Sequence, residues 1–265
     1  MVSRVRVHSL HFYPVKSCRA ISPIIAMVGS RGLIGDREWL VTDPKGYFIT
    51  QRTHPRLSQV QAQPLTEGRL RLTHPLHPSV IVNAARNSLG DSQIIRIVRV
   101  WDREIEALSA GPIAAKFFSE ILETPAELVA AQPDAANFSD GYPLLITSVS
   151  SLAELSSRLL NEIPMARFRP NIVLEGVDAF EEDQISTVQI GAATFNLVKP
   201  CTRCIITSLD QETGVQGVNP LDVLRSYRYD ARYKGVTFGQ NAVVVNGIGA
   251  HLQVGDTVQV QIRTS

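Results

Sequence analysis

The sequence predicts a mainly β protein of the α+β class, with many short strands and a few helices. Two observations support this prediction. Short segments of alternating apolar and polar residues recur along the whole chain, and only three segments carry helical periodicity. A doubly wound parallel sheet would instead alternate strand and helix throughout. The pattern therefore favours β-barrels or sandwiches with helical additions.

The first expected strand covers residues 5–12, and a hairpin follows with arms at residues 38–42 and 47–51. Asp43-Pro44-Lys45-Gly46 joins these arms, with Pro and Gly at positions that a type I turn favours. The other expected strands lie at residues 57–62, 70–73, 80–83, 94–101, 171–174, 188–198, 242–245 and 257–262.

Three helices are expected. Residues 111–122 carry a proline near the first turn, where its missing N–H costs nothing. Ser151 and Glu154 form a capping-box pattern, and apolar residues follow at helical spacing as far as Ile163. A shorter helix is expected at residues 220–227.

The length of 265 residues allows one large domain or two modest ones. The composition is 44% hydrophobic and 19% charged, with a net charge of +1. This balance argues against nucleic-acid binding, because no basic excess exists to neutralise phosphates. Any anion must therefore meet a few placed side chains. The polar, proline-containing stretch at residues 130–140 predicts a boundary between domains at 1–130 and 131–265.

The cysteine count indicates a reducing compartment. Three cysteines, at positions 18, 201 and 204, cannot form a disulfide framework, so we expect a cytoplasmic protein. No run of apolar residues is long enough for a transmembrane helix, so no membrane span is expected.

Cys201-Thr202-Arg203-Cys204 is the most informative segment. Half of a zinc site would need two more ligands, and the nearest pair, His74 and His77, lies far earlier with a proline after each histidine. A redox dithiol should open a helix, whereas the following Ile205-Ile206-Thr207 favours a strand or turn. Two further interpretations stay open: one thiolate that binds a metal brought by a cofactor, or two buried core cysteines.

Other charged segments could meet an anion. Lys16 and Ser17 combine a point charge with a hydroxyl, as in a phosphate site. Arg37 stands between two acidic residues, which is also the pattern of a surface ion pair. Arg169 and Asn171 would share one face of an extended chain. Each segment alone is also compatible with an ordinary exposed loop.

Taken together, these segments resemble the MOSC superfamily, the molybdenum-cofactor sulfurase C-terminal domain proteins. The resemblance is greatest to the branch that contains the mitochondrial amidoxime-reducing component and its bacterial relatives. The matching segments run almost end to end: Tyr13-Pro-Val-Lys-Ser-Cys18, Gly35-Asp-Arg-Glu-Trp39, Thr50-Gln-Arg52, Ser139-Asp-Gly-Tyr-Pro-Leu144, Phe168-Arg-Pro-Asn171, Phe180-Glu-Glu-Asp183, Cys201-Thr-Arg-Cys204, Asp210-Gln-Glu-Thr-Gly214, Phe238-Gly-Gln240 and Val254-Gly-Asp256.

The resemblance implies an N-terminal β-barrel-like domain followed by a β-barrel MOSC domain with a few helices, and a molybdenum pyranopterin in the cleft between them. It implies that Cys204 is the catalytic residue that ligates molybdenum, with Cys201 as a neighbour. The residues implied to hold the pterin and its phosphate are Lys16, Ser17, Arg37, Tyr142, Arg169, Asn171, Thr202 and Arg203.

The implied activity is molybdenum-dependent reduction of N-hydroxylated small molecules, such as amidoximes, hydroxylamines and N-hydroxylated bases. Three cysteines cannot supply the four thiolates of an iron–sulfur cluster, so none is expected in this chain. Electrons would come from a separate protein: a ferredoxin, a cytochrome or a flavoprotein reductase. The alternative is a sulfur-carrier or cofactor-handling MOSC protein that uses a cysteine persulfide.

Overall fold

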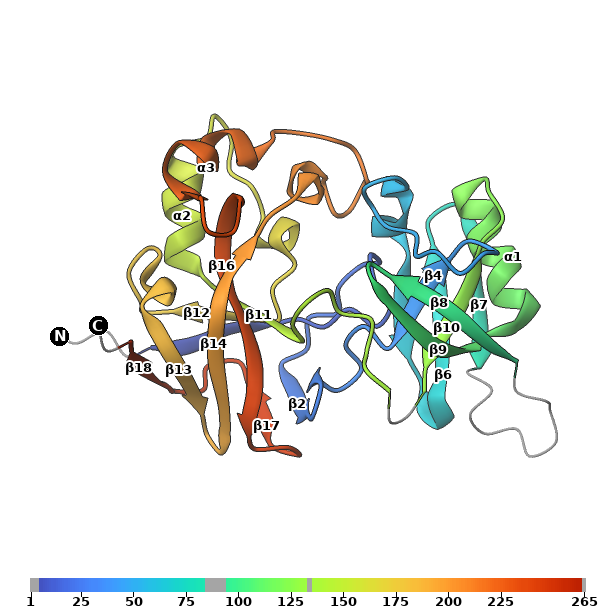
Figure 1. The fold of residues 1–265 in the computed structure, drawn as a ribbon, viewed down its shortest axis with the longest axis horizontal. Helices are drawn as coiled ribbons and strands as arrows, with labels where there is room; N and C mark the ends of the chain where they lie inside the picture. The colour runs from blue at the N-terminus through green and yellow to red at the C-terminus, as the bar shows by residue number, and fades with distance from the viewer. Residues whose placement is uncertain (1–4, 84–93, 133–134, 264–265) are drawn as a thin grey trace.

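The computed structural model describes residues 5–83, 94–132 and 135–263 of the chain. Two bodies lie side by side along the longest axis, and strands dominate both (Figure 1). The mainly β class is confirmed, because the described residues form four sheets and only three α-helices.

The larger sheet is a nearly closed barrel in the strand order β1-β12-β11-β16-β14-β13-β18, with β15 added beside β16. The two ends of this order meet, because Val7 N donates to Asp256 O and Val258 N donates to Val5 O, both at 2.9 Å. Its strands are β1 (Arg6–Leu10), β11 (Leu144–Ser148), β12 (Ile172–Glu175), β13 (Ile185–Ile190), β14 (Ala193–Thr202), β15 (Tyr229–Asp230), β16 (Gly235–Asn246) and β18 (Val258–Ile262).

The other body is a half-barrel of two sheets that share one core. Helix α1 (Gly111–Leu122) packs Phe118 and Ile121 against Leu128 and Leu72, so the helix fills the open side of the strands. The sheets are β4 (Trp39–Thr42), β10 (Glu127–Ala131), β9 (Arg103–Ser109) and β8 (Ile95–Val100), and β5 (Gln61–Pro64), β6 (Arg69–His74) and β7 (His77–Asn83).

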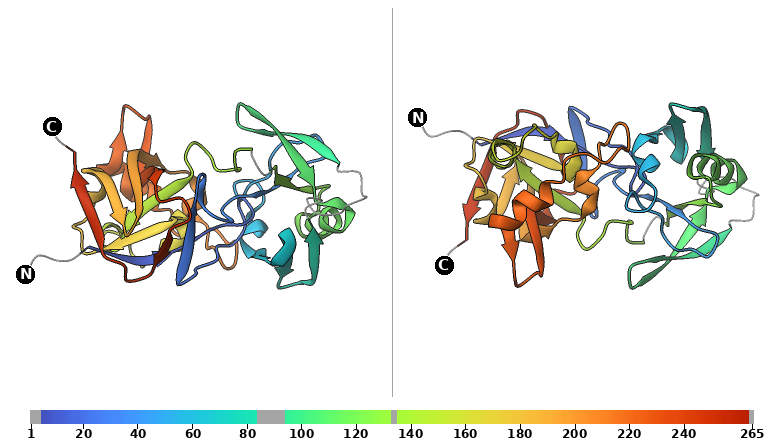
Figure 2. Two further views of the ribbon diagram at one scale, coloured as in Figure 1. Left: turned by 90° about the horizontal axis from the view of Figure 1, so that it is seen from below. Right: turned by 90° about the horizontal axis from the view of Figure 1, so that it is seen from above.

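The first strands of the chain pack into the body formed mainly by the second half. β2 (Ile25–Gly29) pairs with β3 (Gly32–Leu33) and β17 (His251–Gln253). Val28 is fully buried in the same core as Val7 of β1. The loop after β1 reaches the half-barrel core and returns to β2 and β3, and the chain then crosses to β4 and crosses back in the segment after β10 (Figure 2). The division at residues 130/131 stays a prediction, and residues 133–134 of that stretch lie outside the described residues.

Two helices cover one end of the barrel. α2 (Val149–Ser157) and α3 (Pro220–Arg228) share an apolar cluster with Phe168 and Phe238, whose rings stack 4.0 Å apart. The predicted cap at Ser151 is wrong. Ser148 caps α2, with its Oγ accepting from Ser151 N at 3.1 Å, and the helix ends well before Ile163.

Three strand predictions need correction. The stretch at residues 57–62 begins as the 3-10 helix η1 (Pro55–Gln59). The stretch at residues 188–198 divides into β13 and β14 at Gly191, whose φ of 55° suits the turn. The second arm of the early hairpin forms only isolated bridges, although Gly46 N closes the predicted turn on Asp43 O at 3.0 Å. Strands β2, β3, β9, β10, β11, β15 and β17 were not predicted.

Candidate functional site

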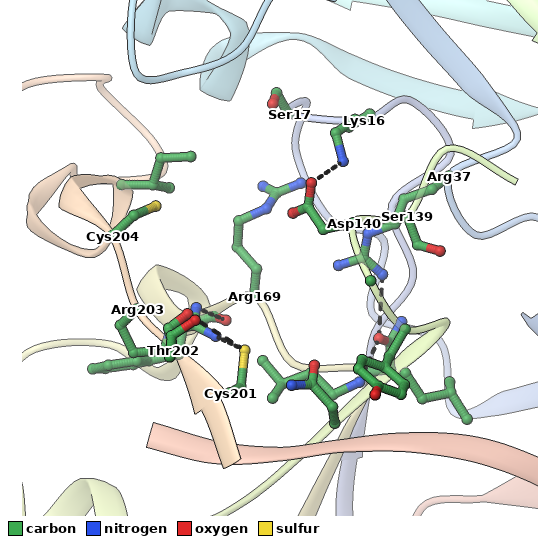
Figure 3. Close-up of a pocket in the computed structure, with 18 of the residues that line it drawn as sticks. Lys16, Ser17, Arg37, Ser139, Asp140, Arg169, Cys201, Thr202, Arg203 and Cys204 are labelled. Atoms are coloured by element: carbon green, nitrogen blue, oxygen red, sulfur yellow. Dashed lines mark hydrogen bonds and ion pairs between the residues drawn. The ribbon is translucent and has the colours of Figure 1, made fainter. Parts of the chain in front are cut away.

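A cavity of about 410 Å³ lies where loops from the two bodies meet (Figure 3). This volume is in the range of small-molecule and cofactor sites. Its lining includes every site residue expected from the sequence, and the roles of these residues stay predictions. They are Lys16, Ser17, Arg37, Tyr142, Arg169, Asn171, Thr202, Arg203 and Cys204.

The cavity concentrates positive charge in a protein whose net charge is only +1. Asp140 is the single carboxylate among the described lining residues. Across the described chain, only Lys16 and Arg37 of the lining cations pair with a carboxylate. The lining cations that form no such ion pair are Arg52, Arg169, Lys199 and Arg203. This excess of cations fits an anionic ligand.

The ring of Tyr13 fixes two of these cations. The guanidinium carbons of Arg37 and Arg169 lie 4.6 and 4.1 Å from its centroid. Burial raises the pKa of Tyr13 to about 12, so the ring stays neutral. Burial lowers the pKa of Arg169 to about 10, which still leaves it charged at neutral pH. Its Nη1 donates to Cys18 O at 2.8 Å, so the side chain is held from two directions.

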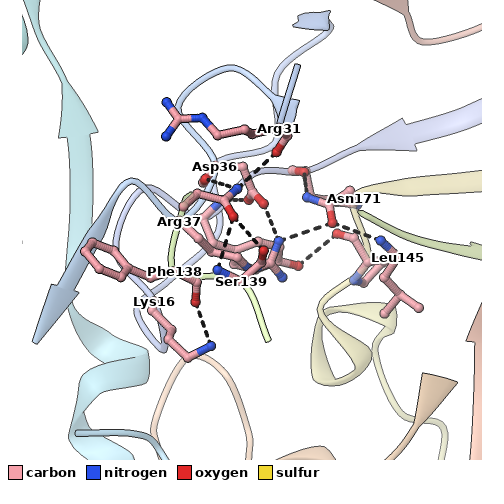
Figure 4. A network of polar contacts seen from close by, with 12 residues as sticks. Lys16, Arg31, Asp36, Arg37, Phe138, Ser139, Leu145 and Asn171 are labelled. Atoms are coloured by element: carbon pink, nitrogen blue, oxygen red, sulfur yellow. Dashed lines mark hydrogen bonds and ion pairs between the residues drawn. The ribbon is translucent and has the colours of Figure 1, made fainter. Parts of the chain in front are cut away.

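A buried polar network orients Arg37 (Figure 4). Its Nη1 contacts Asp36, which is 1% exposed, and donates to Asn171 Oδ1 at 3.2 Å. Asn171 Oδ1 also accepts from Leu145 N at 3.1 Å, and its Nδ2 donates to His11 O at 3.2 Å. The amide of Asn171 is therefore occupied by protein groups, and its evident task is to hold Arg37.

Lys16 is buried beside Asp140. Its Nζ donates to Asp140 Oδ1 at 2.7 Å and to Phe138 O at 2.8 Å. Burial lowers the pKa of Lys16 to about 8. Burial alone would raise the pKa of Asp140, but the Lys16 ammonium and the hydrogen bonds from Lys16 and Trp101 outweigh it and hold that pKa well below its usual range. At neutral pH the two therefore form an ion pair.

Backbone strain gathers around the cavity. Ser17, Arg37, Trp101 and Arg169 have φ values of 66°, 52°, 59° and 54°, in the left-handed region that non-glycine residues avoid. Each such residue costs on the order of 1–3 kcal/mol and persists only where its surroundings impose it. The expectation that Arg169 and Asn171 share a face of an extended chain is wrong, because Arg169 caps the 3-10 helix η3 (Met165–Phe168). Both residues nevertheless line the cavity.

The two cysteines of the tetrapeptide differ in their contacts. Cys201 is the penultimate residue of β14, and its Sγ lies 2.9 Å from Arg203 Nη1. Cys204 precedes the 3-10 helix η5 (Ile205–Ser208), and its Sγ makes no hydrogen bond with any described residue. Both are half-buried and line the cavity, so neither is a core cysteine, unlike Cys18, whose pKa burial raises to about 12.

Protein side chains alone form no metal centre in the part of the chain that the structure describes. No three His, Cys, Asp or Glu residues are grouped there to hold an ion. His74 and His77 lie on the β6–β7 hairpin, with ring centroids 5.1 Å apart. A metal at Cys204 would need further ligands from another source.

Comparison with known proteins decides the family. Residues 4–125 match the MOSC N-terminal beta barrel domain, and residues 133–259 match the MOSC domain. Human mitochondrial amidoxime reducing component 2 is 33% identical over 84% of this chain and 72% of its own. This chain is a MOSC-domain protein. It belongs to the branch that contains the mitochondrial amidoxime-reducing components.

Other relatives support the same family assignment. Human mitochondrial amidoxime-reducing component 1 is 31% identical over 95% of this MOSC protein and 82% of its own length. The rice molybdenum cofactor sulfurase is 28% identical over 97% of this chain and 36% of its own. Among solved structures, the YUAD protein of Bacillus subtilis aligns over 98% of this chain and 97% of its own at 11% identity, with a TM-score of 0.45, which is too low to add to the assignment.

Several lining residues of this MOSC protein were not predicted as site residues. Arg52 and Asp140 lie inside matched motifs, so those motifs were the available signal. Lys199 directly precedes the Pro200-Cys201 pair, and Trp101 was expected only as the end of a strand. No helix in the described ranges is long and apolar enough to cross a membrane.

Proposed function

We propose that this MOSC protein is a molybdenum-cofactor-dependent reductase of N-hydroxylated compounds, with Cys204 as the metal ligand. One observation carries the proposal: the Cys204 sulfur has no hydrogen-bond partner among the described residues and lies in a cavity where four of the lining cations lack a carboxylate partner. Two relatives that cover most of this chain are named for amidoxime reduction.

The donor set fits a molybdenum pyranopterin. A thiolate is a soft ligand of the kind that such a metal takes, and Cys204 offers one. The phosphate of the pterin is dianionic, which suits the excess of cations. Arg203 Nε is buried without a hydrogen-bond partner among the described residues. One N–H donor of the tetrapeptide is therefore available to a ligand. Lys16, Arg37 and Arg169 would contact the phosphate and pterin, together with Ser17, Tyr142, Thr202 and Arg203, while Asn171 would act by holding Arg37.

When bound, the cofactor supplies the two-electron chemistry that reduces N–OH to N–H with release of water. The protein binds and orients the cofactor and the substrate. The Tyr13 stack holds the guanidinium planes of Arg37 and Arg169 at the cavity wall. Lys16 and Asp140 form an ion pair close to these two arginines (Figure 3). Two electrons and two protons enter per turnover, and we propose that the electrons come from a separate ferredoxin, cytochrome or flavoprotein. The cytoplasmic location stays a prediction.

A second candidate function is sulfur transfer. The observation that favours it is the contact of Cys201 Sγ with Arg203 Nη1, because a neighbouring guanidinium stabilises a thiolate and would also stabilise a persulfide. The rice relative is named a molybdenum cofactor sulfurase, which is a name of this class.

The test compares Cys204→Ala with Cys201→Ala, each purified from a host that makes the cofactor. We expect about one molybdenum per chain in the wild type and in Cys201→Ala, and a loss of at least tenfold in Cys204→Ala. Reduction of an amidoxime by a chemical electron donor should follow the metal content. If Cys204→Ala keeps its metal and activity while Cys201→Ala loses a persulfide seen by mass spectrometry, the sulfur-transfer function replaces the reductase.

A further inference from the structure

Trp101 exposes an aromatic ring to a cavity that is otherwise cationic and polar at its surface. It is 54% exposed, and among the described residues it is the one large apolar side chain that lines the cavity while remaining largely uncovered. Leu144 and Phe168 also line the cavity but are 1% and 0% exposed and belong to the cores, and the lining residues Tyr142 and Ile206 are only partly exposed. An uncovered aromatic face inside a binding cavity is a typical contact for the apolar part of a ligand.

The structure holds this ring in place on several sides. Trp101 lies between β8 and β9, with a φ of 59° that a bulky residue adopts only under constraint. Its Nε1 donates to Asp140 Oδ1 at 2.7 Å, and the Phe48 ring meets it edge-on at 5.1 Å. The guanidinium of Arg52 lies 4.9 Å from its centroid.

The same hairpin is attached to the segment that crosses between the bodies. Arg103 Nη2 donates to Ser139 O at 2.7 Å and to Asp140 O at 3.2 Å. Trp101 and Arg103 thus contact one short stretch of chain from the same turn. The ring is therefore fixed relative to the residues from the other body, which carries Cys201 and Cys204.

We propose that Trp101 is a specificity-determining residue, and that its indole selects N-hydroxylated substrates whose N–OH group is attached to a flat aromatic body. This inference rests on the proposed function. The aromatic body of the substrate packs against the exposed indole while the N–OH group enters the cavity. A small aliphatic substrate covers little of the indole and gains little from it, so Trp101 raises the preference for aryl over alkyl substrates.

The test uses the loaded enzyme, benzamidoxime as the aryl probe and acetamidoxime as the alkyl probe. The measured quantity is the ratio of kcat/KM for the two. Trp101→Gln keeps an N–H donor for Asp140 without the ring, and we expect it to lower the aryl preference roughly tenfold, mainly through KM for benzamidoxime. Trp101→Phe keeps a ring without the N–H donor and should retain most of the preference.

Tyr47→Ala is the matched control. Tyr47 is also an exposed aromatic ring of the half-barrel, and the guanidinium of Arg99 lies 5.4 Å from its centroid. Tyr47 does not line the cavity. The aryl preference should not change in this variant. A binding measurement without turnover is available as well. Of the two tryptophans, Trp39 is 7% exposed, so benzamidoxime added without an electron donor should change emission from Trp101 and not in Trp101→Phe.

The possible failures are distinguishable. Equal aryl preference in wild type and Trp101→Gln overturns the role of Trp101 and leaves the reductase intact. A molybdenum content that falls in Trp101→Gln means that the ring contacts the cofactor, which also overturns the inference. Wild-type enzyme that carries molybdenum but reduces neither probe overturns the proposed function itself.

Discussion

The buried Lys16 makes anion binding at the cavity depend on pH. The residue is 6% exposed, and burial lowers the pKa of its ammonium to about 8, with Asp140 partly opposing this shift. Below pH 8 the folded protein keeps the charge, and above it the charge is lost while Asp140 stays ionised. The unfolded chain holds this proton up to its ordinary pKa of 10.5, so between these values Lys16 makes the fold more stable as pH rises.

We therefore predict that the cofactor-free protein binds a phosphate monoester about tenfold more weakly at about pH 9.5 than at about pH 7.5. Glycerol phosphate is a suitable probe because its second pKa of about 6 keeps it dianionic throughout. Calorimetric titration measures the affinity. Lys16→Gln should bind weakly at both pH values. An unchanged wild-type affinity would place the phosphate away from Lys16.

Residue types in the matched motifs predicted much of the cavity lining, because the chemistry of an anion site requires cations. The sequence could not predict which residues hold these cations in place. The stack of Arg37 and Arg169 on Tyr13 depends on left-handed backbone at both arginines, and no residue preference signals this conformation in arginine. Trp101 was missed because its place at the cavity follows from how two bodies meet.

At the scale of elements, the alternation of apolar and polar residues predicted many of the strands but not the positions where a strand bends or ends. β14 and β13 were predicted as one strand, since Gly191 alone marks the turn between them. β3 was missed because two residues are too few to show alternation, and β17 because its partner β2 is distant in sequence. The capping residue of α2 was misplaced by three positions, since Ser148 and Ser151 are both good caps and the tertiary contact of Ser151 with Glu182 decides between them.

β16 contains one position where only glycine fits. Gly239 has a φ of 74°, and a Cβ there would lie 2.6 Å from Thr147 Cγ2 and 2.8 Å from Ile146 O of β11. We predict that Gly239→Ala lowers the free energy of unfolding by roughly 2–4 kcal/mol, through backbone strain and a forced separation of β11 from β16. Urea unfolding measures the change.

Gly249→Ala is the control for strain alone. Its φ is 87°, but a Cβ there meets nothing within 4 Å. The expected loss is about 1 kcal/mol. Equal losses in the two variants would show that the contact with β11 contributes nothing at Gly239.

At the scale of the whole molecule, the two halves of the sequence do not fold as separate units. β1 lies between β12 and the segment that leads into β18. Val7 and Val28 are buried in the core of the barrel, which the second half of the sequence mainly forms. A fragment of residues 131–265 would lack these strands and expose both edges of the barrel to aggregation.

We predict that this fragment does not unfold cooperatively by circular dichroism and elutes as aggregate in size-exclusion chromatography. A second fragment in which residues 5–33 are linked to its N-terminus should restore a cooperative transition, because the missing strand and core residues return. A cooperative, monomeric fragment without residues 5–33 would contradict the prediction.

The pairing of β1 also sets an order of events during synthesis. Val7 is synthesised well before its backbone partners Gly255 and Asp256, which lie more than 240 residues later in the sequence. Contacts so far apart in sequence form slowly. The half-barrel is made of residues that lie close together in sequence, so it can fold before residues 255–258 are made, whereas the barrel closes only after they are. The cavity between the bodies is therefore completed only when the barrel has closed, so its ligand must enter after residues 255–258 have joined β1.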